Sequence, residues 1–316
     1  MTSLLEGRAL VVLHKLEASL ATYDVQTGRE RFRVPTGPFP HEMCLGPDRR
    51  HVFVSEYGLR AVESEGEGGS TVGVFDLRRA QRAATIGLGH NRRPHGIAAH
   101  FGGRLFVTCE PQRALLVLRI EDHSVLHAVD VEQDGPHVVA VSPDGRTAFT
   151  ANIGAGTITA VDVAMGEVLR HVKVESRPEG MVFSPDGRLL YVVNRDSASL
   201  TVVDTTRLDV VSRIETGRGP ARIVMTPNGR HVAVSLFHDD SVQVVDVEAR
   251  ALTHTIRVGP RPAGTTISPD GRVVFVSCED EGRVYAIDVA RGGVIGELET
   301  GEGPGAMLSL DLGEID

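Results

Sequence analysis

The residue that follows a proline at the start of seven short apolar runs is the position in this sequence best suited to chemistry. In chain order this position holds His41, His95, His137, Glu179, Ala221, Ala263 and Gly305. Three imidazoles and a carboxylate are ligands that suit a divalent metal such as Zn, Fe, Mn, Co or Ni. Without a metal, the same groups could work as a general acid/base pair. Repeat drift is the alternative, in which the polar residues are only part of a polar rim.

A second set of residues lies 15 positions after each of these, and it is also partly polar. Its members are Glu56, Glu110, Asn152, Asn194, Leu236, Cys278 and, from the N-terminal segment, His14. We expect Glu56 and Glu110 to accept hydrogen bonds from imidazole N–H groups and so to fix the tautomer that offers the other nitrogen. His14 is either a further polar group of the site or only the contribution of its strand to the rim. Cys278 is expected to be a buried thiol.

The elements that position these residues belong to an internal repeat. Segments that resemble "SPDGRLLYVVNRDSASLTVVDT" begin at residues 142, 184, 226 and 268, which are 42 residues apart. Within a copy, alternating Val, Ile, Phe and Thr predict strands, and Asp-Gly predicts a tight turn between the first two. Four strands per repeat of this length are typical of a β-propeller blade.

The two ends of the chain supply one more blade between them. Residues 9–37 match only the last three strands of a blade, and residues 304–312 match only a first strand. We therefore predict an all-β, seven-bladed propeller that forms a single domain over residues 1–316. Residues 305–312 should be the innermost strand of the blade that residues 9–37 complete, because this pairing removes the open edge of the ring.

One copy is longer than the others. The spacing of the post-proline position is 54 residues in the first copy and 42 in the five that follow. The extra length falls at "ESEGEGGS", residues 63–70, which we interpret as an acidic, glycine-rich hairpin tip.

The segment "SPDGRLLYVVNRDSASLTVVDTTRLDVVSRIETGRGP" resembles the YVTN β-propeller repeat, in which "SPDG", a following Asn, "V-D" and a final "G-x-x-P" recur. The resemblance covers nearly the whole chain. It implies the propeller fold, and the relatives include surface-layer-like proteins, quinoprotein- and cytochrome-like propellers and lactonase-like enzymes. It implies no particular activity, because one fold carries many functions.

Repeat geometry places the post-proline residues around one mouth of a central channel. Four neighbouring blades then carry polar ligand types, while the opposite wall is reduced to Ala, Ala and Gly. This asymmetry favours a site with room for a ligand. We expect His41, His95, His137 and Glu179 to bind one divalent metal, with Glu179 as ligand or base. Arg195 and Arg222 flank the two sets and either bind an anionic substrate or face solvent.

Composition limits the partners. The chain has a formal net charge of −9, which argues against nucleic acid or an anionic membrane as main partner. Its start is not a convincing secretory signal, and no apolar stretch is long enough to span a membrane. Three widely spaced cysteines, Cys44, Cys109 and Cys278, do not form a disulfide framework, and we expect a cytoplasmic protein.

The resulting hypothesis is an enzyme that acts on a small molecule as a lyase, isomerase or oxygenase with a metal at the channel mouth. One alternative is a non-catalytic propeller that binds a protein or a small ligand. The low aromatic content disfavours it, since Tyr57 and Phe237 are among the few candidates for a rim contact. The other alternative is a metal-free acid/base lactonase or lyase.

Overall fold

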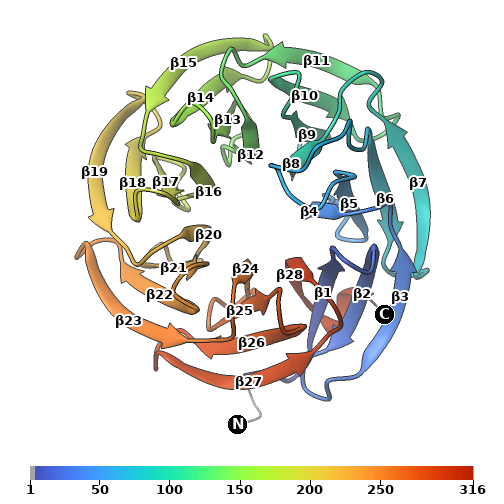
Figure 1. Cartoon of the computed structure of the whole chain (residues 1–316), viewed down its shortest axis with the longest axis vertical. Helices are drawn as coiled ribbons and strands as arrows, with labels where there is room; N and C mark the ends of the chain where they lie inside the picture. Colours follow the sequence, from blue (N-terminus) through green and yellow to red (C-terminus); the bar gives the residue numbers. More distant parts are fainter. Residues whose placement is uncertain (1–3, 316) are drawn as a thin grey trace.

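Seven four-stranded antiparallel sheets form a ring in the computed structural model, which describes residues 4–315 (Figure 1). The predicted seven-bladed propeller is confirmed. Six blades are continuous in sequence. They are β4–β7 (Pro40–Leu45, His51–Glu56, Thr71–Asp76, Gln81–Gly87), β8–β11 (Pro94–His100, Arg104–Cys109, Ala114–Arg119, Val125–Asp130), β12–β15 (Pro136–Val141, Thr147–Asn152, Thr157–Asp162, Glu167–Lys173), β16–β19 (Pro178–Phe183, Leu189–Asn194, Ser199–Asp204, Asp209–Glu215), β20–β23 (Pro220–Met225, His231–Leu236, Ser241–Asp246, Ala251–Arg257) and β24–β27 (Pro262–Ile267, Val273–Cys278, Arg283–Asp288, Gly293–Glu299).

The seventh blade joins the two ends of the chain. It consists of β1 (Arg8–His14), β2 (Ser19–Asp24), β3 (Glu30–Pro35) and β28 (Pro304–Asp311), and a short helix α1 (Leu312–Ile315) follows it. Strand β28 pairs antiparallel with β1, as predicted, and begins one residue earlier than expected. Figure 1 shows β28 beside β1 at the point where the ring closes.

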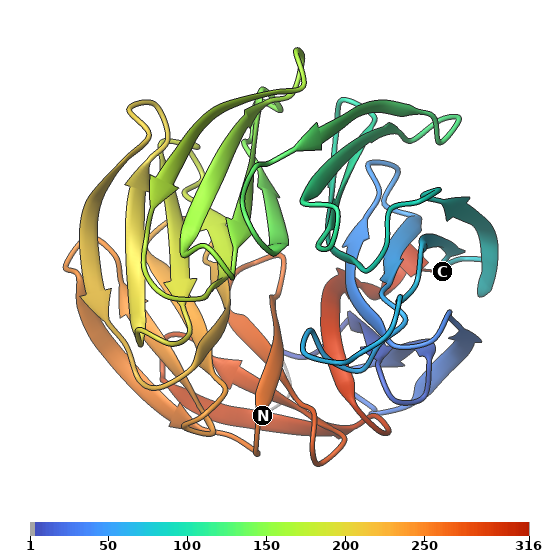
Figure 2. The same ribbon diagram turned by 45° about the horizontal axis from the view of Figure 1, so that its top comes forward.

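The hydrophobic core lies between neighbouring blades, because both faces of each sheet are covered. One buried cluster joins Val11 and Leu13 of β1 to Val52 and Val54 of β5 across the closure. A similar cluster joins the first and second blades. The loops therefore gather at the two ends of the strands, as the tilted view in Figure 2 shows.

Each innermost strand carries an irregularity at its start. The strand pairing shifts register immediately after the proline in the first six blades, for example between Pro136 and Val139 of β12. A bulge re-aims the side chain that it contains. The post-proline residue falls inside this irregular stretch, so the bulge can direct its side chain toward the channel.

Hydroxyl groups on the second strands fix the backbone of the post-proline residue in the next blade. The Ser55 hydroxyl donates to the carbonyl oxygen of His95 at 2.7 Å, and the Thr108 hydroxyl donates to that of His137 at 2.7 Å. Ser277 makes the equivalent bond to Gly305 at 2.8 Å. These buried bonds link one blade to the next at the level of the candidate site.

The extra segment of the first blade is the loop of a hairpin, as expected, because β5 and β6 pair antiparallel with Glu56 opposite Thr71. Its backbone forms turns, bends and irregular stretches, and part of it lies over the channel mouth. The expectation of free thiols is confirmed for Cys44, Cys109 and Cys278. Within residues 4–315, no helix has the length and apolar character needed to cross a membrane.

Removing β28 tests the closure of the ring. A chain that ends at Gly303 should unfold cooperatively at a much lower temperature than the full chain, because β1 loses its partner and the core between the seventh and first blades is exposed. Calorimetry measures the difference. An unchanged melting temperature would contradict the role of the β28–β1 pairing.

Candidate functional site

All seven post-proline residues line one cavity of about 250 Å³ at the channel mouth. The sequence therefore placed this set correctly. Arginine and glutamate side chains from several blades complete the lining, and the insertion after β5 contributes Arg60, Ala61, Val62 and Glu63. At the post-proline positions, one side of the cavity carries histidines and Glu179, and the other carries the small residues Ala221, Ala263 and Gly305. This is the asymmetry expected of a site with room for a ligand.

The three histidines form a continuous row along one wall. The His95 and His137 rings stack with centroids 3.6 Å apart and planes 28° apart, and the His41 ring meets His95 edge-on at 4.9 Å. His41 also stacks on Tyr57 at 4.2 Å. All three imidazoles are at least nine-tenths buried. The row brings imidazoles from three successive blades to one wall of the cavity, and Nε2 of His41 lies 3.0 Å from the carbonyl oxygen of Leu59.

Glu110 orients one of these imidazoles. Its Oε1 lies 2.8 Å from Nδ1 of His137, and its Oε2 accepts a hydrogen bond of 2.6 Å from the Tyr57 hydroxyl. A carboxylate that accepts at Nδ1 selects the tautomer with the proton on that nitrogen. Nε2 of His137 is then the nitrogen available for chemistry. The expected hydrogen bond between Glu110 and an imidazole is present.

The strand register corrects the position that we gave Glu110 in the repeat. Pro94 pairs with Cys109, whereas Pro136 pairs with Asn152, so Cys109 and not Glu110 is the equivalent of Asn152. The stretch from the proline to the start of the second strand is one residue shorter in this blade than in the other five continuous blades, and counting 15 residues therefore overshoots by one. Glu110 lies just beyond the end of β9. From there its carboxylate reaches His137 of the next blade.

Glu56 does not have the role that we expected. It ends β5 in regular register, and its carboxylate accepts hydrogen bonds from Arg82 at 2.5 Å, Thr71 at 2.7 Å and the backbone N–H of Gly37 at 2.7 Å. These partners belong to the outer strands and the preceding loop. Glu56 binds no imidazole and does not line the cavity. It stabilises the first blade.

His14 is also absent from the cavity wall. It is fully buried at the end of β1, beside Tyr23 at a ring distance of 6.2 Å. Burial, assisted by the charge of Arg33, lowers the pKa of His14 to about 4, so the ring is neutral near pH 7. Of the two readings left open by the sequence, the structure favours the one in which His14 is part of its strand. Cys278 is buried as expected, and burial raises the pKa of its thiol to about 12.

Glu179 is surrounded by guanidinium groups and not by imidazoles alone. Its Oε1 lies 2.8 Å from Arg177 and 2.9 Å from Arg195, and its Oε2 lies 3.8 Å from Arg222. Burial acts to raise the pKa of Glu179, but the charges of His137, Arg195 and Arg222 outweigh it and lower that pKa to about 2. Among residues 4–315, the three side chains whose ligand atoms lie within 4.8 Å of one another are His95, Glu110 and His137. The expected group of three histidines with Glu179 is thus not the compact one.

Burial keeps two of the imidazoles uncharged. It lowers the pKa of His95 well below the usual value, and the neighbouring His137 adds to this shift. The pKa of His41 is lowered in the same way, with a further contribution from Lys15. A neutral His95 avoids the repulsion that a second cation stacked on His137 would create.

Several residues of the site were missed or misplaced in the sequence. An Arg-Pro pair recurs at residues 93–94, 177–178 and 261–262, and this recurrence is the signal that could have pointed to Arg177. Tyr57 is completely buried and is no rim residue. Phe237 is covered by two guanidinium groups, those of Arg195 at 4.2 Å and Arg261 at 4.8 Å from the ring centroid. The cavity is consequently richer in arginine than the sequence indicated.

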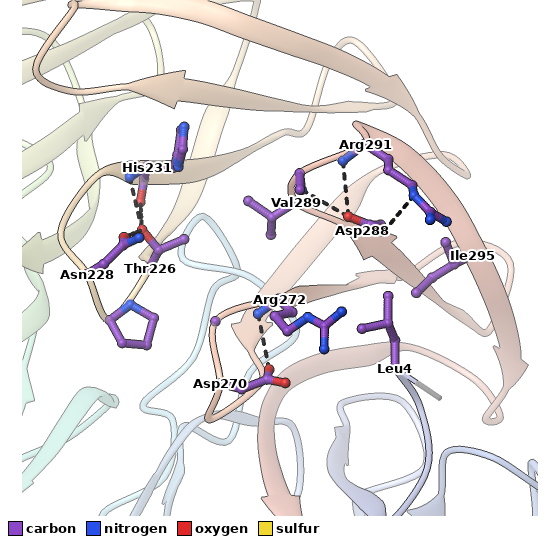
Figure 3. Close-up of a pocket in the computed structure, with 13 residues that line it drawn as sticks. Leu4, Thr226, Asn228, His231, Asp270, Arg272, Asp288, Val289, Arg291 and Ile295 are labelled. Carbon is purple, nitrogen blue, oxygen red and sulfur yellow. Dashed lines mark hydrogen bonds and ion pairs between the residues drawn. The ribbon is translucent and has the colours of Figure 1, made fainter. Parts of the chain in front are cut away.

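A larger cavity of about 780 Å³ lies at the opposite ends of the strands, between turns of the fifth and sixth blades (Figure 3). Its polar side chains hold their own turns. Asp270 accepts from the backbone N–H of Arg272 at 3.1 Å, and Asp288 accepts from that of Arg291 at 3.0 Å. We do not assign a function to this cavity, because its polar groups are occupied by these turns.

Comparison with known proteins agrees with this architecture. The chain is a seven-bladed propeller with a polar cavity at one channel mouth. It belongs to the family described as "Lactonase, 7-bladed beta-propeller", whose model matches residues 40–306.

Individual relatives are distant. The chain is 22% identical to Antigen Lp49 of Leptospira interrogans serogroup Icterohaemorrhagiae serovar copenhageni (strain Fiocruz L1-130) over 159 residues, which are 50% of this chain and 34% of the antigen. The chain thus matches about a third of the length of that relative. Its fold is similar to hydrazine synthase of Kuenenia stuttgartiensis, with a TM-score of 0.73, 18% identity and coverage of 88% of this chain and 94% of the other. A functionally unknown protein from Desulfotomaculum acetoxidans DSM 771 gives a TM-score of 0.77, 14% identity and coverage of 96% and 99%.

The buried histidines predict how stability depends on pH. The folded pKa of His95 lies below its unfolded value of about 6.5, so the unfolded chain binds more protons as the pH falls. The contribution of His95 to stability is therefore present above the unfolded pKa of about 6.5 and should be lost progressively as the pH falls below it. His95→Gln should flatten this dependence, whereas His90→Gln, on an exposed turn, should not. Melting temperatures measured across this range check it, and equal slopes for the two variants would contradict the assignment.

Proposed function

We propose that this protein is a metal-free acid/base enzyme that opens or closes the lactone ring of a small anionic substrate. The observation that carries the proposal is the Tyr57–Glu110–His137 hydrogen-bonded chain, which ends at the wall of an arginine-lined cavity. Membership of a lactonase family supports the reaction class. This choice corresponds to the metal-free alternative considered from the sequence.

In the hydrolytic direction His137 is the general base. Its Nε2 takes a proton from a water molecule while the water oxygen bonds to the lactone carbonyl carbon. The ring C–O bond then breaks, and the leaving alkoxide oxygen receives that proton from Nε2. The imidazolium formed on the way is stabilised by Glu110 through Nδ1–H. The products are one hydroxyl group and one carboxylic acid, which ionises at neutral pH.

The arginines suit an anionic substrate and a developing oxyanion. Arg195 and Arg222 line the cavity and are largely buried, and Arg222 also forms an ion pair with Glu42 across the channel. Guanidinium groups bind carboxylates in a fixed, forked geometry, and they act strongly where water is excluded. The small residues Ala221, Ala263 and Gly305 leave space opposite the histidines.

A second candidate function keeps the divalent metal, and the compact group of His95, Glu110 and His137 favours it. Both oxygens of Glu110 already accept hydrogen bonds, so its role there would be to orient His137 while the imidazoles bind the ion. The planes of the stacked His95 and His137 rings are 28° apart, so nitrogen lone pairs, which lie in the ring planes, converge poorly on one ion. Metal binding would therefore require one ring to turn, whereas the acid/base function would not.

Three free, separated cysteines are typical of a reducing compartment and support a cytoplasmic location.

Substitution of the base tests the main proposal. A panel of γ- and δ-lactones, with and without a carboxylate substituent, can be screened by pH-stat, since ring opening releases a proton. His137→Ala should reduce kcat/KM by about 10²–10⁴-fold with an unchanged circular dichroism spectrum. Glu110→Gln should show a smaller loss, because the amide cannot stabilise the imidazolium. Wild-type activity in His137→Ala would contradict the assignment of the base.

Metal analysis separates the two candidates. Protein purified without chelator or histidine tag should contain less than about a tenth of an equivalent of Zn, Fe, Mn, Co or Ni, and should keep its activity after dialysis against EDTA. One equivalent of metal that disappears in both His95→Ala and His137→Ala would instead establish the metal-dependent alternative.

A further inference from the structure

The insertion between β5 and β6 is attached to the first blade by a narrow neck. The Gly69 N–H donates to the carbonyl oxygen of Tyr57 at 2.6 Å, and Gly58 has a φ of +81°, a value that few other residues adopt. A Cβ on Gly69 would lie 2.0 Å from the carbonyl oxygen of Glu56. Glycine is therefore required at this neck, and the segment beyond it stands apart from the sheet.

Arginine side chains hold the insertion over the cavity from two directions. Arg93 of the second blade donates to three of its carbonyl oxygens, those of Val62 at 3.3 Å, Ser64 at 3.2 Å and Gly66 at 2.7 Å. From the fourth blade, Arg177 donates to Glu63 at 2.8 Å. The Glu63–Arg177 pair thus bridges the mouth of the channel.

The carboxylates that neutralise the arginines of the cavity differ in exposure. The side chain of Glu179 is 4% exposed and that of Glu42 is 16% exposed, whereas that of Glu63 is 66% exposed. Exposed ion pairs contribute little to stability, because water competes for both charges. Glu63 is accordingly the carboxylate that another anion can replace at the smallest cost.

We propose that Arg177 is a specificity-determining residue and that Glu63 occupies its anion-binding position until an anionic group of the substrate displaces it. The substrate class is then a small acid with a second anionic group, one carboxylate or phosphate for Arg177 and one for Arg195 and Arg222. The exchange keeps Arg177 paired, and it releases the insertion from the fourth blade. The reaction of this substrate rests on the proposed function. The anion-binding site rests only on the Glu63–Arg177 ion pair.

Anion binding tests the exchange without a known substrate. Inorganic phosphate and acetate are titrated into the full chain by calorimetry at constant ionic strength. Glu63→Gln removes the internal competitor and should tighten binding of the preferred anion about two- to fivefold. Glu65→Gln is the matched control, since Glu65 is exposed in the same segment and has no hydrogen bond or ion pair within residues 4–315. It should leave the affinity unchanged.

Arg177→Gln should weaken anion binding by at least about tenfold, while Arg177→Lys should have an intermediate effect because it keeps the charge and loses the fork. Hydrogen exchange of residues 59–69 should become faster when the anion binds to the wild-type chain. Slower exchange on binding, equal affinities for Glu63→Gln and Glu65→Gln, or no binding of either anion would overturn the inference. His137→Ala should bind the anion normally, so a failure of the catalytic proposal remains distinguishable from a failure of this one.

Discussion

The antiparallel pairing of β28 with β1 is the interaction on which the rest of the structure depends. It converts an open row of sheets into a ring, and only a ring directs seven equivalent positions toward one axis. The site is built from blades as far apart as the first and the fifth, which the Glu42–Arg222 pair connects across the channel. A change in closure therefore affects the cavity, because Gly305 and Ala306 of β28 and Lys15, which follows β1, line it.

Within that ring, chemistry arises where the repeat is broken. In a regular blade the last residue of the second strand bonds within its own sheet. The side-chain amide of Asn152, for example, donates hydrogen bonds to the hydroxyl groups of Thr157 and Thr159. The second blade is one residue shorter before β9, and this shift places Glu110 beyond the strand end, next to His137. The first blade is longer after β5, and this places Tyr57 behind Glu110 and the insertion over the mouth. Two changes in length thus place the carboxylate that orients His137 and the segment that covers the cavity.

The sequence was informative where the periodicity was strict. The number of blades, the joining of the chain ends and the convergence of the post-proline residues all follow from a 42-residue repeat, because each copy must fold alike. The repeat pattern did not predict the hydrogen-bond partners of individual side chains, because these depend on local geometry. Glu56 and Glu110 look equivalent by counting, yet one binds Arg82 and the other binds His137. Glu179 looks like a metal ligand, yet three arginines surround it. One of them, Arg177, belongs to an Arg-Pro pair that recurs at residues 93–94 and 261–262, but the recurrence does not show which carboxylate the guanidinium group binds.

Glu110 holds the proton of His137 on Nδ1 and leaves Nε2 free as the base. This tautomer can be measured by nitrogen NMR of the imidazoles, with the His137 signals assigned by their loss in His137→Gln. At neutral pH we expect the Nδ1–H tautomer for His137, and loss of this preference in Glu110→Gln. An Nε2–H tautomer in the wild-type protein, or a spectrum unaffected by Glu110→Gln, would contradict it.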